Sequence, residues 1–317
     1  MKRVILILLT ACLLADCFCA CGQDNSVYTE KPNDFFSAMD TEEPTDFFSA
    51  IAIYNQNHDG LGRLVAITTR PNEVTVTGKI WFARECLKLI LEPDLNVIWK
   101  ATLVRDSEYF GQSIYTDDGR IEFSESAFIE GPLELESTAV ISGGTIEGNI
   151  ACRYGSLTVT GGVIEGSIYC KRGFEITGGT IKGNIVSEAS NVLAGATVFG
   201  SYADFDIAGG IIEGNIYCGN SNLNITEGII KGNISSEEKA DGEGVGGFSI
   251  GIVDAPYLSW PGNARIFGGT VQGNINYNGD IMITNGVVEG KIAGKSVKYS
   301  EDEPEEAEAT EIIITQK

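Results

Sequence analysis

Between residues 141 and 292 the chain alternates apolar and polar positions in short units that recur along the sequence. The shared pattern is apolar-x-Gly-Gly-x-apolar-x-Gly-x-apolar, and the starts of eight units are separated by 18, 17, 17, 14, 18, 41 and 17 residues. The units begin at Ile141, Val159, Ile176, Leu193, Ile207, Ile225, Ile266 and Ile283. A recurring period of this length is typical of a repeat architecture, in which similar units stack on one another.

Inside a unit the apolar residues recur at every second position, which is the period of a β-strand. Ile146, Ile150 and Cys152 share one parity, and Gly143-Gly144 lies where the chain must turn a corner. One unit cannot bury its apolar face alone, but stacking places isoleucine on isoleucine about 4.8 Å apart. We therefore predict an all-β fold, a single-stranded right-handed parallel β-helix with rungs of 17–18 residues.

The Gly-Asn-Ile rungs at this period resemble those of bactofilins, whose compact right-handed β-helices polymerise. The Gly-Gly-Thr-Ile units are also similar to glycine-rich, pectin-lyase-like β-helix proteins of bacterial cell surfaces. The resemblance covers about residues 141–299 and implies a fold more than a function. The long region before residue 141, which begins with a stretch typical of a secretory signal, departs from the bactofilin pattern.

The remaining segments differ from the repeats in pattern and composition. Residues 61–140 carry strand and turn signals without the period, and we predict irregular first rungs and an N-terminal cap. A separate small β domain is the alternative. We assign residues 141–299 to the repeats, with a loop insertion at 235–265, and residues 300–317 to an acidic tail that includes Ile312-Ile313-Ile314.

Residues 1–20 are typical of a secretory signal, because a basic start precedes an apolar stretch too short to span a membrane. Cys21 follows Ala20 and resembles the lipidated cysteine of a bacterial lipobox, which predicts a membrane anchor. Cys12 fits the motif locally but leaves only a stub of signal, and Cys17 follows an unfavourable Asp16. Simple secretion is the alternative to lipidation.

We predict that residues 21–60 form a flexible tether between this anchor and the folded body. The tether contains a short duplication, Asp-Phe-Phe-Ser-Ala at 34–38 and again at 46–50. A second interpretation makes the two phenylalanine pairs a docking motif for a partner groove.

Charge and composition exclude several classes of function. The 317 residues include 44 acidic and 22 basic side chains, a formal net charge of −22 that repels phosphate backbones. We therefore expect no nucleic-acid partner. His58 is the single histidine, which excludes a zinc site built on a histidine cluster.

Stacking turns repeat positions into columns, two of which contain candidate chemistry. Cys152 and Cys170 lie inward on adjacent rungs, either as small buried residues or as a disulfide. Glu147 and Glu165 lie outward as a like-charge pair, which is either a solvated face or a calcium or sugar site. We expect no cofactor, with calcium as the one candidate metal. A column of asparagines is expected to satisfy its own amides along the axis.

The insertion joins an acidic, glycine-rich stretch to Tyr257 and Trp260, a combination that suits a carbohydrate surface. We expect a non-enzymatic bacterial surface lipoprotein, extracytoplasmic and membrane-anchored, that acts as an adhesin, a glycan binder or an envelope scaffold. One alternative is a bactofilin-like scaffold that self-associates into polymers. A polysaccharide lyase or hydrolase is less favoured, because six of the seven spacings leave no room for cleft-forming loops.

Overall fold

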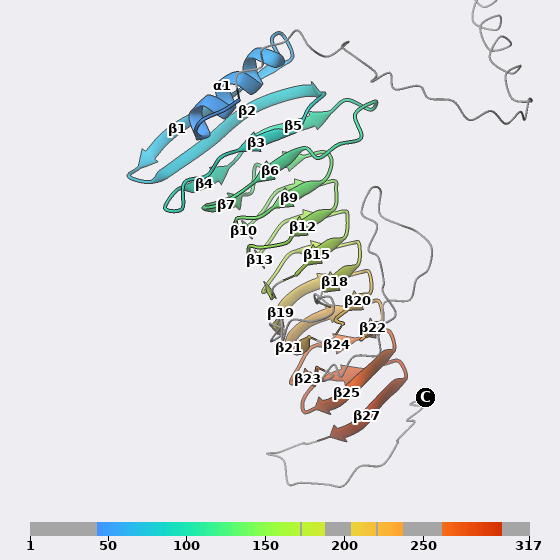
Figure 1. Cartoon of the computed structure of the whole chain (residues 1–317). Helices are drawn as coiled ribbons and strands as arrows, with labels where there is room; N and C mark the ends of the chain where they lie inside the picture. The colour runs from blue at the N-terminus through green and yellow to red at the C-terminus, as the bar shows by residue number, and fades with distance from the viewer. Residues whose placement is uncertain (1–42, 172, 188–203, 220, 237–261, 300–317) are drawn as a thin grey trace, which may run out of the picture. The chain divides into compact units, whose positions relative to one another are not determined.

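The computed structural model describes residues 43–171, 173–187, 204–219, 221–236 and 262–299 (Figure 1). All of them belong to one compact unit, which contains one helix and 27 strands of a single sheet. Every strand pairing in the described structure is parallel except that of β1 (Gly62–Arg70) with β2 (Glu73–Ala83), which is antiparallel.

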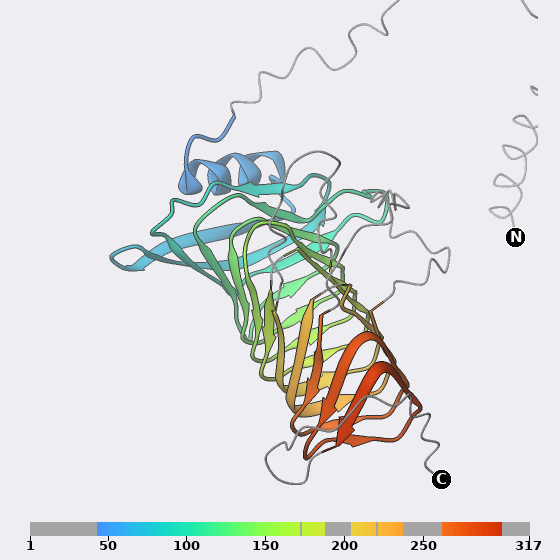
Figure 2. The ribbon, with the colours of Figure 1, turned by 60° about the horizontal axis from the view of Figure 1, so that its bottom comes forward.

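The strands form three parallel ladders, one on each side of a coil (Figure 2). After the first part of β2, the first ladder contains β4 (Asn96–Trp99), β7 (Arg120–Phe123), β10 (Thr138–Ile141), β13 (Leu157–Val159), β16 (Phe174–Ile176), β19 (Asp204–Ile212), β21 (Asn222–Ile230), β23 (Ala264–Ile266), β25 (Ile275–Ile283) and β27 (Ile292–Tyr299). The second ladder contains the ends of β2, β19 and β21 together with β5 (Thr102–Arg105), β8 (Phe128–Ile129), β11 (Thr145–Ile146), β14 (Val163–Ile164), β17 (Thr180–Ile181), β24 (Thr270–Val271) and β26 (Val287–Val288).

The third ladder ends on the starts of β25 and β27. Before them it contains β3 (Leu87–Leu89), β6 (Ile114–Thr116), β9 (Leu133–Leu135), β12 (Ile150–Cys152), β15 (Ile168–Cys170), β18 (Ile185–Ser187), β20 (Ile216–Tyr217) and β22 (Ile234–Ser235). The predicted all-β parallel solenoid is confirmed, while its right-handed coiling stays a prediction.

The core is a set of apolar columns between the ladders. In the second ladder Ile146, Ile164 and Ile181 are register neighbours, and none of them is measurably exposed. The corners depend on glycine, since Gly144 has a φ of 74° and a Cβ there would lie 2.3 Å from the carbonyl oxygen of Ala127. Close backbone stacking at the corners and β-branched packing between them explain the repeat pattern.

The fourth predicted rung needs correction. Its residues, Leu193–Tyr202, lie outside the described residues, and Ile185 of β18 pairs directly with Ile216 of β20. The stretch 188–203 is therefore an insertion between two neighbouring coils, as is 237–261, across which Ile234 pairs with Ile275. The spacing of 14 residues was the sequence signal, because it is too short for a rung.

Residues 62–140 enter the same ladders as the repeats, so the first rungs are continuous with them. The prediction of a tether over residues 21–60 does not hold for its described part, where Phe47–Asn57 form the helix α1. Asp46 and Ser49 make a capping box at its start, and Phe47 is buried in the core of this chain. The second Asp-Phe-Phe-Ser-Ala copy is thus a helix start, in which Phe47 is buried and Phe48 stays 47% exposed.

Candidate functional site

Both insertions leave the solenoid at the same corner, between the third strand of one coil and the first strand of the next. One follows β18 at Ser187, and the other follows β22 at Ser236. Because β18, β20 and β22 are successive strands of the third ladder, the two exits lie two strands, or about 10 Å, apart. The sequence pattern had indicated one insertion, and the structure places the exits of two at this corner.

An outward column of the third ladder runs beside this corner. Tyr169 of β15, Val186 of β18 and Tyr217 of β20 are consecutive register partners, and we call these three residues the tyrosine strip. Each lies next to an inward isoleucine in its own strand and so points away from the core. Val186 is nevertheless only 5% exposed, and both tyrosines are half-buried. The strip therefore places two partly exposed aromatic side chains on either side of a covered valine.

Polar groups continue the same column toward the N-terminus. Gln112 donates a hydrogen bond to the carboxylate of Glu134 (2.5 Å), and the Arg153 guanidinium lies 3.4 Å from its other oxygen. The Tyr115 hydroxyl donates to Glu136 (3.1 Å). Burial, and then this carboxylate, raises the pKa of Tyr115 to about 12, which keeps the hydroxyl protonated at neutral pH.

The two predicted acidic site residues lie side by side but have different surroundings. Glu147 and Glu165 follow register-paired residues of β11 and β14, and both are exposed. The Glu165 carboxylate accepts a hydrogen bond from Lys182 (2.7 Å), which raises the pKa of Lys182. In the described part of the chain no three acidic, histidine or cysteine side chains are grouped to hold a metal ion. Calcium binding at Glu147 and Glu165 stays a prediction.

The cysteine column is buried as expected. Cys152 and Cys170 are register partners, each 1% exposed, and a disulfide between them stays a prediction. Cys218 is in the same column, and burial raises its pKa to about 12. The remaining predicted site residues, Cys21, Tyr257 and Trp260, lie outside the described residues.

The asparagine column is bonded differently from the prediction. The side-chain oxygen of Asn215 accepts from the backbone N–H of Asn233 (2.8 Å), and that of Asn233 accepts from the N–H of Asn274 (2.8 Å). Among the described residues, two side-chain amides of the column bond directly where Asn233 donates to Asn215 (3.1 Å). Ser167 replaces asparagine in one coil, and its hydroxyl accepts from the Asn184 N–H (3.0 Å). The column therefore satisfies backbone donors at a corner.

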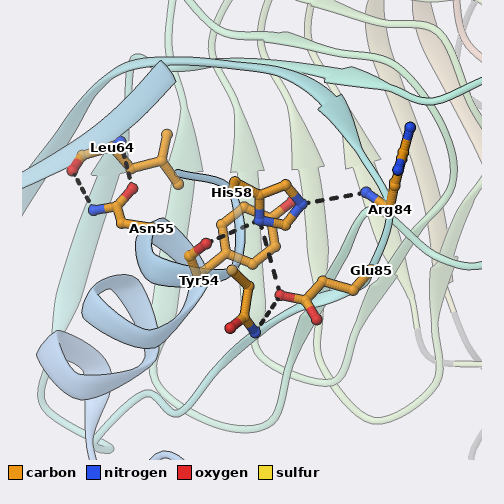
Figure 3. A network of polar contacts seen from close by, with 7 residues as sticks. Tyr54, Asn55, His58, Leu64, Arg84 and Glu85 are labelled. Carbon is orange, nitrogen blue, oxygen red and sulfur yellow. Dashed lines mark hydrogen bonds and ion pairs between the residues drawn. The ribbon is translucent and has the colours of Figure 1, made fainter. Parts of the chain in front are cut away.

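A second polar network joins α1 to the strand that enters the third ladder (Figure 3). His58 is 2% exposed, its Nδ1 lies 2.8 Å from the Tyr54 carbonyl oxygen, and its Nε2 lies 3.2 Å from the Arg84 backbone nitrogen. These partners assign the proton to Nδ1, since the Arg84 N–H must donate to Nε2. Glu85 lies 3.8 Å from Nδ1 and accepts from Asn57 (2.8 Å).

This network closes the N-terminal end of the core. The Tyr54 ring is buried against His58, with ring centroids 4.3 Å apart, and burial raises the pKa of its hydroxyl. The sequence contained no signal for this arrangement, because a lone histidine after a polar segment has no preferred partner. We assign the network to the N-terminal cap rather than to ligand binding.

The comparisons add no relative to this description. Neither protein-family models, nor curated proteins, nor solved structures gave a match to this chain. Within the described residues, no helix has the length and apolar character needed to cross a membrane.

Proposed function

We propose that this chain is a non-enzymatic bacterial surface lipoprotein whose solenoid presents a glycan-binding face at the third-ladder corner. The observation that carries the proposal is the exit of two insertions, 188–203 and 237–261, from one corner beside the tyrosine strip. Loops held by a rigid scaffold are where proteins commonly bind ligands.

The chemistry of the strip suits sugars. Tyr169 and Tyr217 are two strands apart, or about 10 Å, which is the span of two sugar rings. An aromatic ring covers the apolar face of a sugar, while its hydroxyl and nearby carboxylates bond to sugar hydroxyls. Tyr257 and Trp260 belong to the second insertion and extend the same composition. A neutral or cationic glycan fits best, because the chain has a net charge of −22.

The anchoring part of the proposal rests on the sequence. A basic and apolar start, followed by Cys21, is typical of an exported lipoprotein. Incorporation of radiolabelled palmitate into the full chain in a bacterial host, abolished by Cys21→Ala, is the expected result, and globomycin should leave the labelled chain uncleaved. Equal labelling of both chains would contradict an anchor at Cys21.

The N-terminal cap bears on the bactofilin-like alternative. Direct stacking of one solenoid on the next needs an uncovered first coil, whereas here α1 packs on β1 and β3 and covers part of it. The cap therefore disfavours a polymer in which the coils of successive copies stack directly on one another.

Binding of the full chain to an array of bacterial envelope glycans tests the ligand class. We expect Tyr217→Ala and Trp260→Ala each to weaken binding at least about tenfold, the loss of one stacking contact. Phe267→Ala is the matched control, since Phe267 is 41% exposed at a different corner. Absence of binding to any glycan, or an equal loss in the control, would overturn the proposal.

A further inference from the structure

At the N-terminal end of the ladders β1 and β3 each pair on one side only, and β1 is the longer of the two. In the described structure β1 pairs with β2 alone. At Leu64 the outer edge is closed, because both backbone groups of Leu64 bond to the Asn55 side chain (2.8 Å each). The groups of Ala66 and Thr68 point the same way, since backbone direction alternates along a strand. No group in the described part of the chain bonds to them, so the edge is available to another strand there.

The side chains of this edge are apolar and exposed. Val65 is 42% exposed and Ile67 is 55% exposed on the outward face of β1. In both views of the structure the hairpin of β1 and β2 projects beyond the coil that follows it (Figures 1 and 2). α1 lies against β1 at Leu64, so an added strand has room on the part of β1 that runs from Ala66 toward the hairpin tip (Figure 1).

The hairpin is also basic within an acidic protein. Residues 62–83 contain three basic residues, Arg63, Arg70 and Lys79, and one acidic residue, Glu73. The whole chain, by contrast, has a net charge of −22. Arg63 and Lys79 are opposite one another in register and both are exposed. This local charge favours an acidic partner.

The chain itself contains a segment of matching chemistry. Residues 300–317 contain seven acidic side chains and then Ile312-Ile313-Ile314-Thr315, a run of β-branched residues with high strand propensity. An antiparallel alignment of that run with the outer edge of β1 sets the acidic part of the segment beside Arg70 and the hairpin tip. Neither a bilayer nor a sugar would supply the backbone partners that Ala66 and Thr68 lack.

The geometry indicates which copy supplies the segment. Eleven strand pairings along the first ladder separate β1 from β27, or about 53 Å. Ile312 lies 13 residues after Tyr299, a reach of about 44 Å when fully extended, so the isoleucine run falls short of β1 in the same chain. The segment must then come from a second molecule.

We infer that the C-terminal segment of one copy adds as a strand to the outer edge of β1 in another copy, and so links solenoids head to tail. This inference goes beyond glycan binding and does not depend on it. Strand addition supplies the affinity through backbone hydrogen bonds, and the acidic and basic side chains set the direction.

The test is sedimentation velocity of the full chain over a concentration series, with Cys21→Ser in every variant so that lipid does not cause association. We expect oligomers that grow with concentration and dissociate in about 0.5 M salt. Ile67→Lys and, separately, Ile313→Lys should each raise the concentration of half-association at least about tenfold. Val287→Lys is the matched control, because Val287 is 54% exposed in β26.

Thr68→Pro provides a second variant of the edge, since it removes an outward N–H without changing a side chain on the apolar face. Circular dichroism and melting temperature check that each variant is folded. A monomer at all concentrations overturns the inference, as does association that survives Ile67→Lys and Thr68→Pro. Association that is lost in the edge variants but kept in Ile313→Lys overturns the inference too. So does binding of the edge to anionic vesicles by a chain that stays monomeric.

Discussion

The side-chain amide of Asn55 pairs with both backbone groups of Leu64 as a neighbouring strand would. Its nitrogen donates to the Leu64 carbonyl oxygen, and its oxygen accepts from the Leu64 N–H, both at 2.8 Å. Asn55 lies in α1 and Leu64 in β1, so the two bonds fix the helix over the first coil. One side chain thus closes part of a strand edge and positions the cap.

Replacement of Asn55 should therefore loosen the cap. We expect Asn55→Ala to lower the free energy of unfolding by about 1–2 kcal/mol, because two hydrogen bonds at a half-buried position are lost. Asn57→Ala is the control. Its hydrogen bond to Glu85 is exposed, so its loss should lower the free energy of unfolding by only about 0.5 kcal/mol. Urea denaturation measures both, and equal effects would contradict the role given to Asn55.

The asparagine column makes a prediction about which side chains can replace it. Asn215→Ala leaves the Asn233 N–H without its side-chain acceptor, and we expect a loss of about 1–2 kcal/mol. Asn215→Ser should cost less, because Ser167 performs the same role for Asn184 in its own coil. Chemical denaturation of the two variants checks this order, with exposed Gln272→Ala as the neutral control. An equal loss for serine and alanine would show that the acceptor does not matter.

The glycine column one position before the asparagine column should tolerate no side chain. A Cβ on Gly232 would lie 2.1 Å from the carbonyl oxygen of Gly214 in the neighbouring coil. We expect Gly232→Ala to destabilise the protein by about 3 kcal/mol, since backbone would have to move. Gly60→Ala is the control, because only its φ of 79° opposes a side chain and about 1 kcal/mol is expected. Similar melting temperatures for the two variants would contradict close coil stacking.

The outward ion pairs predict a weak dependence of stability on pH. The Lys231 ammonium bonds to Glu213 at 2.8 Å and lowers the pKa of Glu213 below its ordinary 4.5. A carboxyl with a lowered pKa adds stability above its unfolded-state pKa and loses it as pH falls through its folded-state pKa. The stability difference between wild type and Lys231→Met should therefore be small at neutral pH and absent at about pH 2.

Denaturation curves at the two pH values measure this difference. Lys100→Met is the control, since no carboxylate contacts exposed Lys100 in the described part of the chain. High salt should reduce the difference at neutral pH, because the pair is exposed and screened. A difference that grows on acidification would contradict the assignment.

Periodicity by itself determined the parallel solenoid, the inward isoleucine columns and the glycine corners. Ile146 and Ile164 were predicted to stack because a period of two within a unit and of 17 or 18 between units leaves one compact arrangement. Where the period is interrupted, the sequence no longer predicted which residues form a coil. Leu193–Tyr202 matched the pattern loosely, yet its coil neighbours pair with each other instead.

Only the tertiary structure decided how the first coil is capped and which side chains lie beside the insertion corner. Asn55 and Leu64 are nine residues apart, and no local pattern tells an amide to replace a strand. Likewise, Tyr169 and Tyr217 become neighbours of one exit corner only when coils 17 to 31 residues long are wound into register. A repeat determines its own packing through identical neighbours, whereas caps and binding faces depend on contacts that occur once.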